Sequence, residues 1–216
     1  MDTETTITHQ LPRLNEPAPD FEAPTTHGVK KLSDYRGRWL VLFSHPADFT
    51  PVCTTEFIGF AEAYDDFQSL NTDLLGLSID STYSHIAWTR TIKEKFGVEI
   101  PFPIIADLSM DVAHRYGMIQ PGASDTSTVR CTFVIDDKGI MRAMIYYPLS
   151  NGRSIAEVLR IVEALQTSDA NAVATPEGWT PGEKVIVPPP SDATEADRRM
   201  DEGYECVDWW FCKKAL

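Results

Sequence analysis

Two short, continuous runs of apolar residues predict buried strands in the first half of the chain. Residues 39–43 and 74–79 are rich in apolar side chains that are common in strands, and both runs are too short for helices. After the first run, apolar residues recur at helical spacing, as Phe57, Phe60 and Tyr64 do. The further predicted elements are helices over residues 53–70, 84–96, 109–116 and 154–166 and strands over residues 104–106, 131–135 and 141–147.

A turn sequence separates the last two predicted strands. Residues 136–139 read Asp-Asp-Lys-Gly, and a glycine at this place tolerates the positive φ of a tight hairpin turn. The predicted order is therefore strands and helices in alternation, then a hairpin, then a covering helix. This order is typical of an α/β fold with a mixed central sheet flanked by helices.

The two ends of the chain have a different pattern. Residues 11–29 are rich in proline and short polar residues and predict an extended lead-in. Residues 170–190 contain five prolines without a helical period, which predicts an extended arm. A short helix is expected within residues 191–203, followed by an aromatic cluster in residues 204–212. We expect this cluster to pack on its own domain or on another subunit, because exposed aromatic groups are costly in water.

Composition and charge narrow the class of protein. The 216 residues are 43% hydrophobic, enough for one large domain or one domain with a substantial appendage. The 19 basic and 32 acidic residues leave a net charge of −13, which disfavours nucleic acid or an anionic membrane as a partner. No apolar run approaches the roughly 20 residues of a membrane helix. Residues 1–10 resemble neither a signal nor a transit peptide, which predicts a cytoplasmic protein with reduced thiols.

Cys53 lies at a predicted helix start. Thr50 is a favourable N-cap and Pro51 suits the first helical position, so Cys53 occupies the third. Free backbone N–H groups and the helix dipole favour an anion there, and a thiolate is the nucleophilic form of cysteine. The alternative is a small buried residue with no chemistry, a common state of cysteine. From spacing alone, the two interpretations stay equally open.

The amino-acid sequence around Cys53 resembles that of a known protein family. Residues 46–53 match the Pro-x-x-x-Thr-x-x-Cys signature of the peroxiredoxins, and residues 44–56 resemble the peroxiredoxin-6-like, or 1-Cys, branch. The resemblance continues through residues 129–136 and 151–153. The ending Cys-Val-Asp-Trp-Trp-Phe-Cys is similar to archaeal-type members. Essentially the whole chain from Leu11 onward is covered.

The resemblance implies a fold, an organisation and a reaction. It implies a thioredoxin-like peroxidase domain over residues 11–170 and an extended C-terminal arm for dimerisation and resolution over residues 171–216. The enzyme would be an antioxidant peroxidase without metal, haem, flavin or other cofactor. Hydrogen peroxide and organic hydroperoxides would oxidise Cys53 to a sulfenic acid, which a thioredoxin-like or other dithiol reductant would recycle. The family further suggests homodimers assembled into a decameric ring.

The same resemblance implies roles for individual residues. Thr50 would hydrogen-bond the sulfur and the peroxide, and Pro46 would shield the sulfur from water. Arg130 would hold the thiolate and stabilise charge on the breaking O–O bond. The supporting positions would be His45 as the branch's active-site histidine, with Glu56 and Arg153 orienting the arginine.

The other three cysteines have separate interpretations. Cys131 begins an apolar strand and is expected in the core. Cys206 and Cys212 do not form a Cys-x-x-Cys motif, and no nearby residues complete a zinc site. The remaining role is resolution: Cys212 is predicted to attack the oxidised Cys53 of another subunit, with Cys206 as auxiliary. An intrachain Cys206–Cys212 disulfide and two buried, inert thiols remain the competing outcomes.

One departure from the branch affects the expected function. The Gly-Asp-Ser motif that accompanies phospholipase activity in some members is missing, since the first strand follows Gly37-Arg38. Lipid hydrolysis is therefore not expected. A second hypothesis for the same cysteine is an oligomeric holdase chaperone or a peroxide sensor, which would turn over slowly with a recycling donor.

Overall fold

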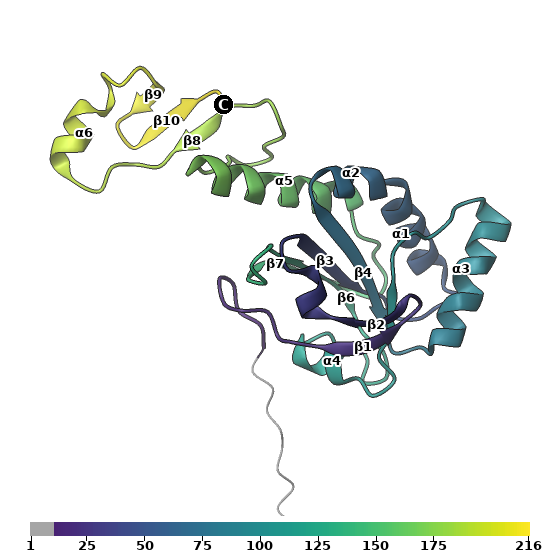
Figure 1. Ribbon diagram of the computed structural model, residues 1–216. Helices are drawn as coiled ribbons and strands as arrows, with labels where there is room; N and C mark the ends of the chain where they lie inside the picture. Colours follow the sequence, from purple (N-terminus) through teal and green to yellow (C-terminus); the bar gives the residue numbers. More distant parts are fainter. Residues whose placement is uncertain (1–10) are drawn as a thin grey trace, which may run out of the picture. The chain divides into compact units, whose positions relative to one another are not determined.

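The computed structural model describes residues 11–216 and divides into two compact units, one ending at Ile155 and the other spanning Ala156–Leu216. The first unit is built on a seven-stranded sheet in the order β2-β1-β5-β4-β3-β6-β7 (Figure 1). Its strands are β1 Glu22–Thr25, β2 Gly28–Lys31, β3 Trp39–Ser44, β4 Thr72–Ser78, β5 Ile104–Ala106, β6 Arg130–Ile135 and β7 Met141–Tyr147. Its helices are a 3-10 helix Leu32–Tyr35 and α-helices α1 Pro51–Glu62, α2 Tyr64–Ser69, α3 Thr82–Phe96 and α4 Asp111–Arg115.

The sheet is mixed, as the order of elements predicted. Strand β3 pairs in parallel with β4 and antiparallel with β6, so it lies at the centre. All six residues of β3 are buried, which explains its unbroken apolar sequence. The β6–β7 hairpin turns at Gly139, whose φ of 76° is the positive value expected there.

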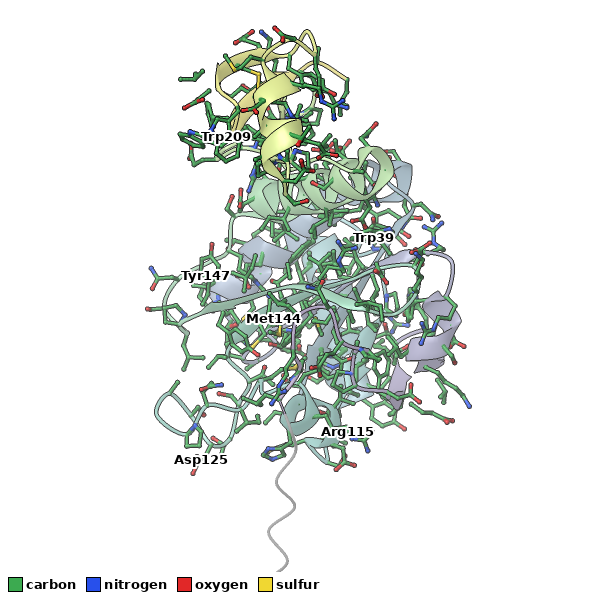
Figure 2. All side chains as sticks on the ribbon, turned by 90° about the vertical axis from the view of Figure 1, so that its left-hand side faces the viewer. Trp39, Arg115, Asp125, Met144, Tyr147 and Trp209 are labelled. Atoms are coloured by element: carbon green, nitrogen blue, oxygen red, sulfur yellow. A yellow bond between two sulfur atoms is a disulfide. The ribbon has the colours of Figure 1, made fainter. Side chains whose placement is uncertain are left out.

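Helices cover both faces of this sheet. On one face, Leu40 and Leu42 of β3 share a core with Val112 and Ala113 of α4. Met144 packs against the same core from the edge strand (Figure 2). On the other face, the ring of Phe43 contacts the rings of two α1 phenylalanines, and α3 adds the fully buried Trp88. Alternate side chains of a strand point to opposite faces of the sheet, so β3 packs against helices on both sides. The predicted α/β architecture is confirmed.

Three elements differ from the predictions in detail. The lead-in at residues 11–29 contains β1 and the start of a β1–β2 hairpin, which its short polar sequence did not indicate. The predicted helix over residues 53–70 is two helices, because the chain leaves helical geometry at Ala63. The last predicted helix continues to Asn171 instead of ending at residue 166.

The second unit carries the C-terminal arm, which is a small folded sheet instead of a bare extended segment. Its elements are α5 Ile155–Asn171, β8 Val185–Val187, α6 Ala193–Arg199, β9 Glu205–Asp208 and β10 Phe211–Lys214. The strand order is β8-β10-β9, and Trp179 packs with Val185 and Ala164 in a core of its own. Trp209 and Trp210 remain 42% and 54% exposed, so the packing of this cluster on another subunit stays a prediction (Figure 2).

Candidate active site

Cys53 lies at the third position of α1 and is fully buried. Helix α1 begins at Pro51, and Thr50 is its N-cap in an extended conformation, as the sequence predicted. The Thr50 hydroxyl does not cap the helix, however, because it donates to the carbonyl of Ala47 at 2.9 Å. The first N–H groups of a helix have no partner within it, so the sulfur lies in a region of positive potential.

The loop before α1 holds the other residues of the signature. Pro46 and Thr50 are half-buried, and Phe49 between them is exposed with a φ of 56°. This left-handed backbone is unfavourable for a phenylalanine and persists only where surrounding structure enforces it. The loop therefore sets Thr50 in place at a local conformational cost.

Arg130 is the positive group next to the sulfur. It is the first residue of β6, and its Nη1 lies 3.3 Å from Cys53 Sγ and 2.8 Å from Glu56 Oε2. Its Nε and Nη2 donate to the carbonyl of Leu149 at 3.1 and 2.9 Å. The side chain is 3% exposed, so this charge is held in one orientation in a region of low dielectric.

Glu56 links Arg130 to a second buried arginine. It follows Cys53 by less than one helical turn, so both side chains share a face of α1. Arg153 donates its backbone N–H and its Nε to Glu56 Oε1 and its Nη2 to Oε2, at 2.8 to 2.9 Å. Burial alone would raise the pKa of Glu56, but hydrogen bonds and charge from Arg153, with the charge of Arg130, hold it below its usual value.

We expect Glu56→Gln to lower the free energy of unfolding at neutral pH by about 2 kcal/mol, because two buried arginines lose their shared anion. A depressed carboxylate pKa stabilises the fold above the unfolded pKa, and this stabilisation is lost as the pH falls through the folded value. The difference between Glu56→Gln and wild type should therefore shrink in acid. Urea unfolding at several pH values measures this, and a pH-independent difference would contradict it.

His45 forms a second buried cluster at the same end of β3. Its Nε2 lies 2.9 Å from Asp48 Oδ1, and Asp48 also contacts Nδ1 of His85 on α3 at 2.8 and 3.0 Å. Burial would raise the pKa of Asp48, but hydrogen bonds from His45 and His85 bring it below its usual value. The three ligand atoms lie within 4.8 Å of one another, close enough for a metal ion, but the hydrogen bonds between them account for this arrangement.

Sequence reasoning named His45 but missed Asp48 and His85. Asp48 lies inside the signature segment, so its position was a signal that could have been used. His85 is a single histidine within a predicted helix, and nothing in its surrounding sequence indicates burial or a partner.

An open, mostly apolar groove borders the loop. Its volume is 410 Å³, and it runs from Thr50 past Trp88 to Phe96. The other lining residues are Phe49, Pro51, Thr54, Thr55, Ile58, Thr91 and Ile92.

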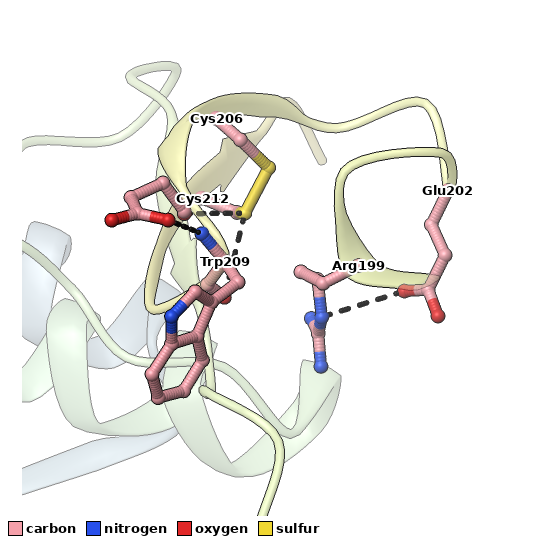
Figure 3. Close-up of a disulfide and its surroundings, with 6 residues drawn as sticks. Arg199, Glu202, Cys206, Trp209 and Cys212 are labelled. Carbon is pink, nitrogen blue, oxygen red and sulfur yellow. Dashed lines mark hydrogen bonds and ion pairs between the residues drawn. A yellow bond between two sulfur atoms is a disulfide. The ribbon is translucent and has the colours of Figure 1, made fainter. Parts of the chain in front are cut away.

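The remaining cysteines lie in two settings. Cys131 is fully buried in the sheet core, and burial raises the pKa of its thiol to about 12, which confirms the packing interpretation. Cys206 and Cys212 face each other across β9 and β10 and are joined by a disulfide (Figure 3). Cys212 is 1% exposed and Cys206 is half-buried. The structure thus brings together Cys53, Arg130, Glu56 and Arg153, and separately pairs the two tail cysteines in the second unit.

Comparisons with known proteins show the family to which the chain belongs. Residues 14–144 match the AhpC/TSA family model, and residues 164–203 match the C-terminal domain of 1-Cys peroxiredoxin. A peroxiredoxin of Aquifex aeolicus is 62% identical, covering 95% of this chain and 98% of its own. One from Thermotoga maritima is 54% identical, covering 96% and 99%.

Solved structures show the same relationship. A yeast mitochondrial 1-Cys peroxiredoxin superposes with a TM-score of 0.84 at 39% identity, covering 94% of this chain and 99% of its own. The peroxiredoxin 6 of Arenicola marina gives 0.83 at 34%, covering 94% and 98%. The fold is therefore the thioredoxin-like fold of thiol-dependent oxidoreductases. The chain belongs to the peroxiredoxin family and is a peroxidase that takes peroxide and a thiol reductant. No helix within residues 11–216 is long and apolar enough to cross a membrane.

Proposed function

We propose that this peroxiredoxin reduces hydrogen peroxide and small organic hydroperoxides with Cys53 as its peroxidatic residue. The main observation that supports this proposal is the 3.3 Å contact between Arg130 Nη1 and Cys53 Sγ at a helix N-terminus. The Cys53 thiolate attacks the terminal peroxide oxygen, the O–O bond breaks, and the sulfur becomes a sulfenic acid while water or an alcohol leaves. Consumption of peroxide over many cycles with dithiothreitol as donor tests this function.

The surrounding residues have distinct parts in this reaction. The guanidinium of Arg130 stabilises the thiolate and the negative charge that develops on the leaving oxygen. Glu56 and Arg153 fix the plane of that guanidinium through their shared hydrogen bonds. The Thr50 hydroxyl donates its hydrogen to the Ala47 carbonyl, so its oxygen is available to accept a hydrogen bond from the peroxide, and Pro46 limits the approach of water.

The groove beside Thr50 supports organic hydroperoxides as substrates. Its lining is mostly apolar side chains, which favour an alkyl or aromatic substituent over bulk water. To measure this contribution, the rates with hydrogen peroxide and with cumene hydroperoxide are compared between wild type and Ile58→Ser. This variant leaves Cys53 and Arg130 in place. The variant should slow only the organic substrate.

We further propose that Cys212 resolves the sulfenic acid of Cys53 on a neighbouring subunit and that Cys206 then takes over the disulfide. The thiolate of Cys212 displaces hydroxide, which leaves as water, and Cys206 attacks the resulting intersubunit bond. The Cys206–Cys212 disulfide supports this proposal, because it is the bond that the second exchange would leave. A thioredoxin-like or other dithiol reductant then restores both thiols.

After stoichiometric peroxide, we expect wild type to end with the intrachain Cys206–Cys212 disulfide, Cys206→Ser to accumulate a covalent dimer that contains a Cys53–Cys212 peptide, and Cys206→Ser/Cys212→Ser to lose that dimer. The physical reason is that only a free thiol can displace the sulfenic hydroxyl. Non-reducing electrophoresis with mass mapping measures the product, and Cys131→Ser is the matched control because that thiol is buried. Cross-linking of Cys212→Ser at the level of Cys206→Ser would assign resolution to Cys206.

We also propose an organisation of the protein, which the family resemblance suggests. We assign residues 11–170 to the peroxidase domain and residues 171–216 to a dimerisation and resolving arm, in homodimers that assemble into a decameric ring. The dithiol partner and the reduced thiols fit a cytoplasmic antioxidant enzyme. Sedimentation velocity of the reduced and oxidised protein measures the assembly.

A second candidate function, a holdase chaperone or peroxide sensor, is favoured by one observation. Val207, Trp209 and Trp210 are exposed at the disulfide hairpin and offer an apolar surface. This function predicts one oxidation per chain and suppression of aggregation of a heated client protein. If the protein turns over repeatedly with dithiothreitol and does not suppress aggregation of the client protein, its function is that of a peroxidase alone.

A further inference from the structure

The disulfide of the second unit presents its two cysteines unequally. Cys206 lies on β9, an edge strand of the small sheet, and is half-buried. Cys212 lies on β10, between β8 and β9, and is 1% exposed (Figure 3). In thiol–disulfide exchange a thiolate must reach the sulfur that it attacks, so access decides which of the two cysteines reacts. Cys206 is therefore the cysteine that an external thiol reaches.

The surroundings of Cys212 suit the sulfur that leaves. Its Sγ lies 3.5 Å from the carbonyl oxygen of Asp208 and 3.9 Å from that of Trp209. Both oxygens accept hydrogen bonds, and a reduced cysteine is a weak S–H donor. A Cys212 thiol formed by reduction thus has acceptors in place without a rearrangement of the hairpin.

The hairpin between the two cysteines has an exposed apolar surface. Val207 is 78% exposed, and the side chains of Trp209 and Trp210 extend this surface. A groove of 420 Å³ lies between Trp209 and two alanines of α6, Ala193 and Ala196. Exposed aromatic groups beside a groove are typical of surfaces that bind another protein, where tryptophan often contributes much of the affinity.

The charge around this surface bears on the kind of thiol that it accepts. Residues 191–216 carry seven acidic and four basic side chains, and Asp192 and Asp197 line the groove itself. Glutathione is a small anion without an apolar surface, so it gains nothing from the tryptophans and is repelled by the carboxylates. A protein dithiol with an apolar surface around its reactive sulfur matches the hairpin better.

We propose that a thioredoxin-like protein dithiol docks on Val207, Trp209 and Trp210 and attacks Cys206, with Cys212 as the leaving group. This inference rests on the proposed function, in which the Cys206–Cys212 disulfide is the product that must be reduced. The first thiolate of the reductant bonds to Cys206 Sγ while the bond to Cys212 breaks, and Cys212 takes a proton from solvent. The second thiolate of the reductant then displaces Cys206, so the reductant becomes a disulfide and two electrons have passed to the arm.

Trapping the mixed disulfide tests which sulfur is attacked. In the full-length Cys53→Ser protein, diamide closes the hairpin disulfide without peroxide. This protein is mixed with a bacterial thioredoxin whose second active-site cysteine is serine, quenched in acid within seconds, and its free thiols are alkylated. Tandem mass spectrometry should find thioredoxin on Cys206 at least about tenfold more often than on Cys212. An adduct on Cys212, or an equal distribution, would overturn the proposal.

The docking surface is tested with Trp209→Ser/Trp210→Ser. We expect kcat/KM for reduction by intact thioredoxin to fall about tenfold, whereas reduction by dithiothreitol stays within about twofold of wild type. Tyr83→Ser removes an exposed aromatic side chain from α3 and is the matched control. An unchanged rate with thioredoxin would show that a neighbouring subunit or nothing covers the tryptophans, and the proposal would be wrong. Faster reduction of wild type by glutathione than by thioredoxin would also contradict it.

These results are independent of the reaction with peroxide. Both measurements start from a disulfide that diamide has formed, so they report on reduction alone. If peroxide leaves Cys206 and Cys212 of the wild type as thiols, the proposed resolving step fails, whatever the trapping shows. If peroxide forms the disulfide but thioredoxin is trapped on Cys212, the proposed function stands and this inference fails.

Discussion

Replacing Cys53 with serine is expected to abolish peroxide consumption while the protein remains folded. The structure places the Cys53 sulfur 3.3 Å from Arg130 Nη1, and a serine hydroxyl in its place is not ionised at neutral pH. Serine is close in size to cysteine, and its hydroxyl oxygen can accept a hydrogen bond from Arg130 Nη1, so this buried position should accept it with little loss of stability. Peroxide disappearance in the presence of dithiothreitol measures the activity, and thermal unfolding measures the fold.

Cys131→Ser is the control for this variant. Cys131 is also fully buried and directly follows Arg130 in the sequence. Burial raises the pKa of its thiol, however, so it stays protonated. We expect this variant to consume peroxide at the wild-type rate, although a buried hydroxyl lowers its stability. Sustained turnover by Cys53→Ser would move the reaction to another cysteine and refute the assignment.

Arg130→Ala is expected to slow the oxidation of Cys53 by two orders of magnitude or more, about 3 kcal/mol in the activation free energy. The guanidinium contacts both the sulfur and Glu56 within the buried site, so alanine removes the charge nearest the reacting atoms. Stopped-flow tryptophan fluorescence after mixing with peroxide measures the rate.

Two further variants separate charge from geometry. Arg130→Lys keeps the charge but cannot reproduce the fork that binds Glu56 and the Leu149 carbonyl, so an intermediate rate is expected. Arg90→Ala removes an exposed arginine from α3 and should leave the rate unchanged. A wild-type rate for Arg130→Ala would restrict Arg130 to a structural role.

Local sequence patterns predicted the elements that depend on local physics. The start of α1 followed from the Thr-Pro-Val-Cys order, which also placed Cys53 at the third helical position. The central strand followed from its unbroken apolar run. These features are decided by a few neighbouring residues, so they can be read without knowing the rest of the chain.

The long-range part of the site required the family resemblance. Arg130 and Arg153 reach the α1 residues across sequence separations of 74 and 97, and no periodicity connects such distant positions. His85 could not be found at all, because its role depends on a helix packing against the end of a strand. The β1–β2 hairpin was missed since Pro24 lies within β1, and proline argues against a strand except at positions that donate no hydrogen bond.

The arginine–glutamate arrangement has a consequence for the charge of the buried site. Two guanidiniums and one carboxylate leave one uncompensated positive charge, so the pocket is electrically neutral only with the sulfur as thiolate. In the proposed cycle, oxidation of Cys53 to a sulfenic acid removes that anion while the cations stay buried. The oxidised pocket is thus less favourably solvated by the protein than the reduced one, and electroneutrality returns when Cys53 again becomes a thiolate. The same charges that promote the attack on peroxide also favour completion of the cycle.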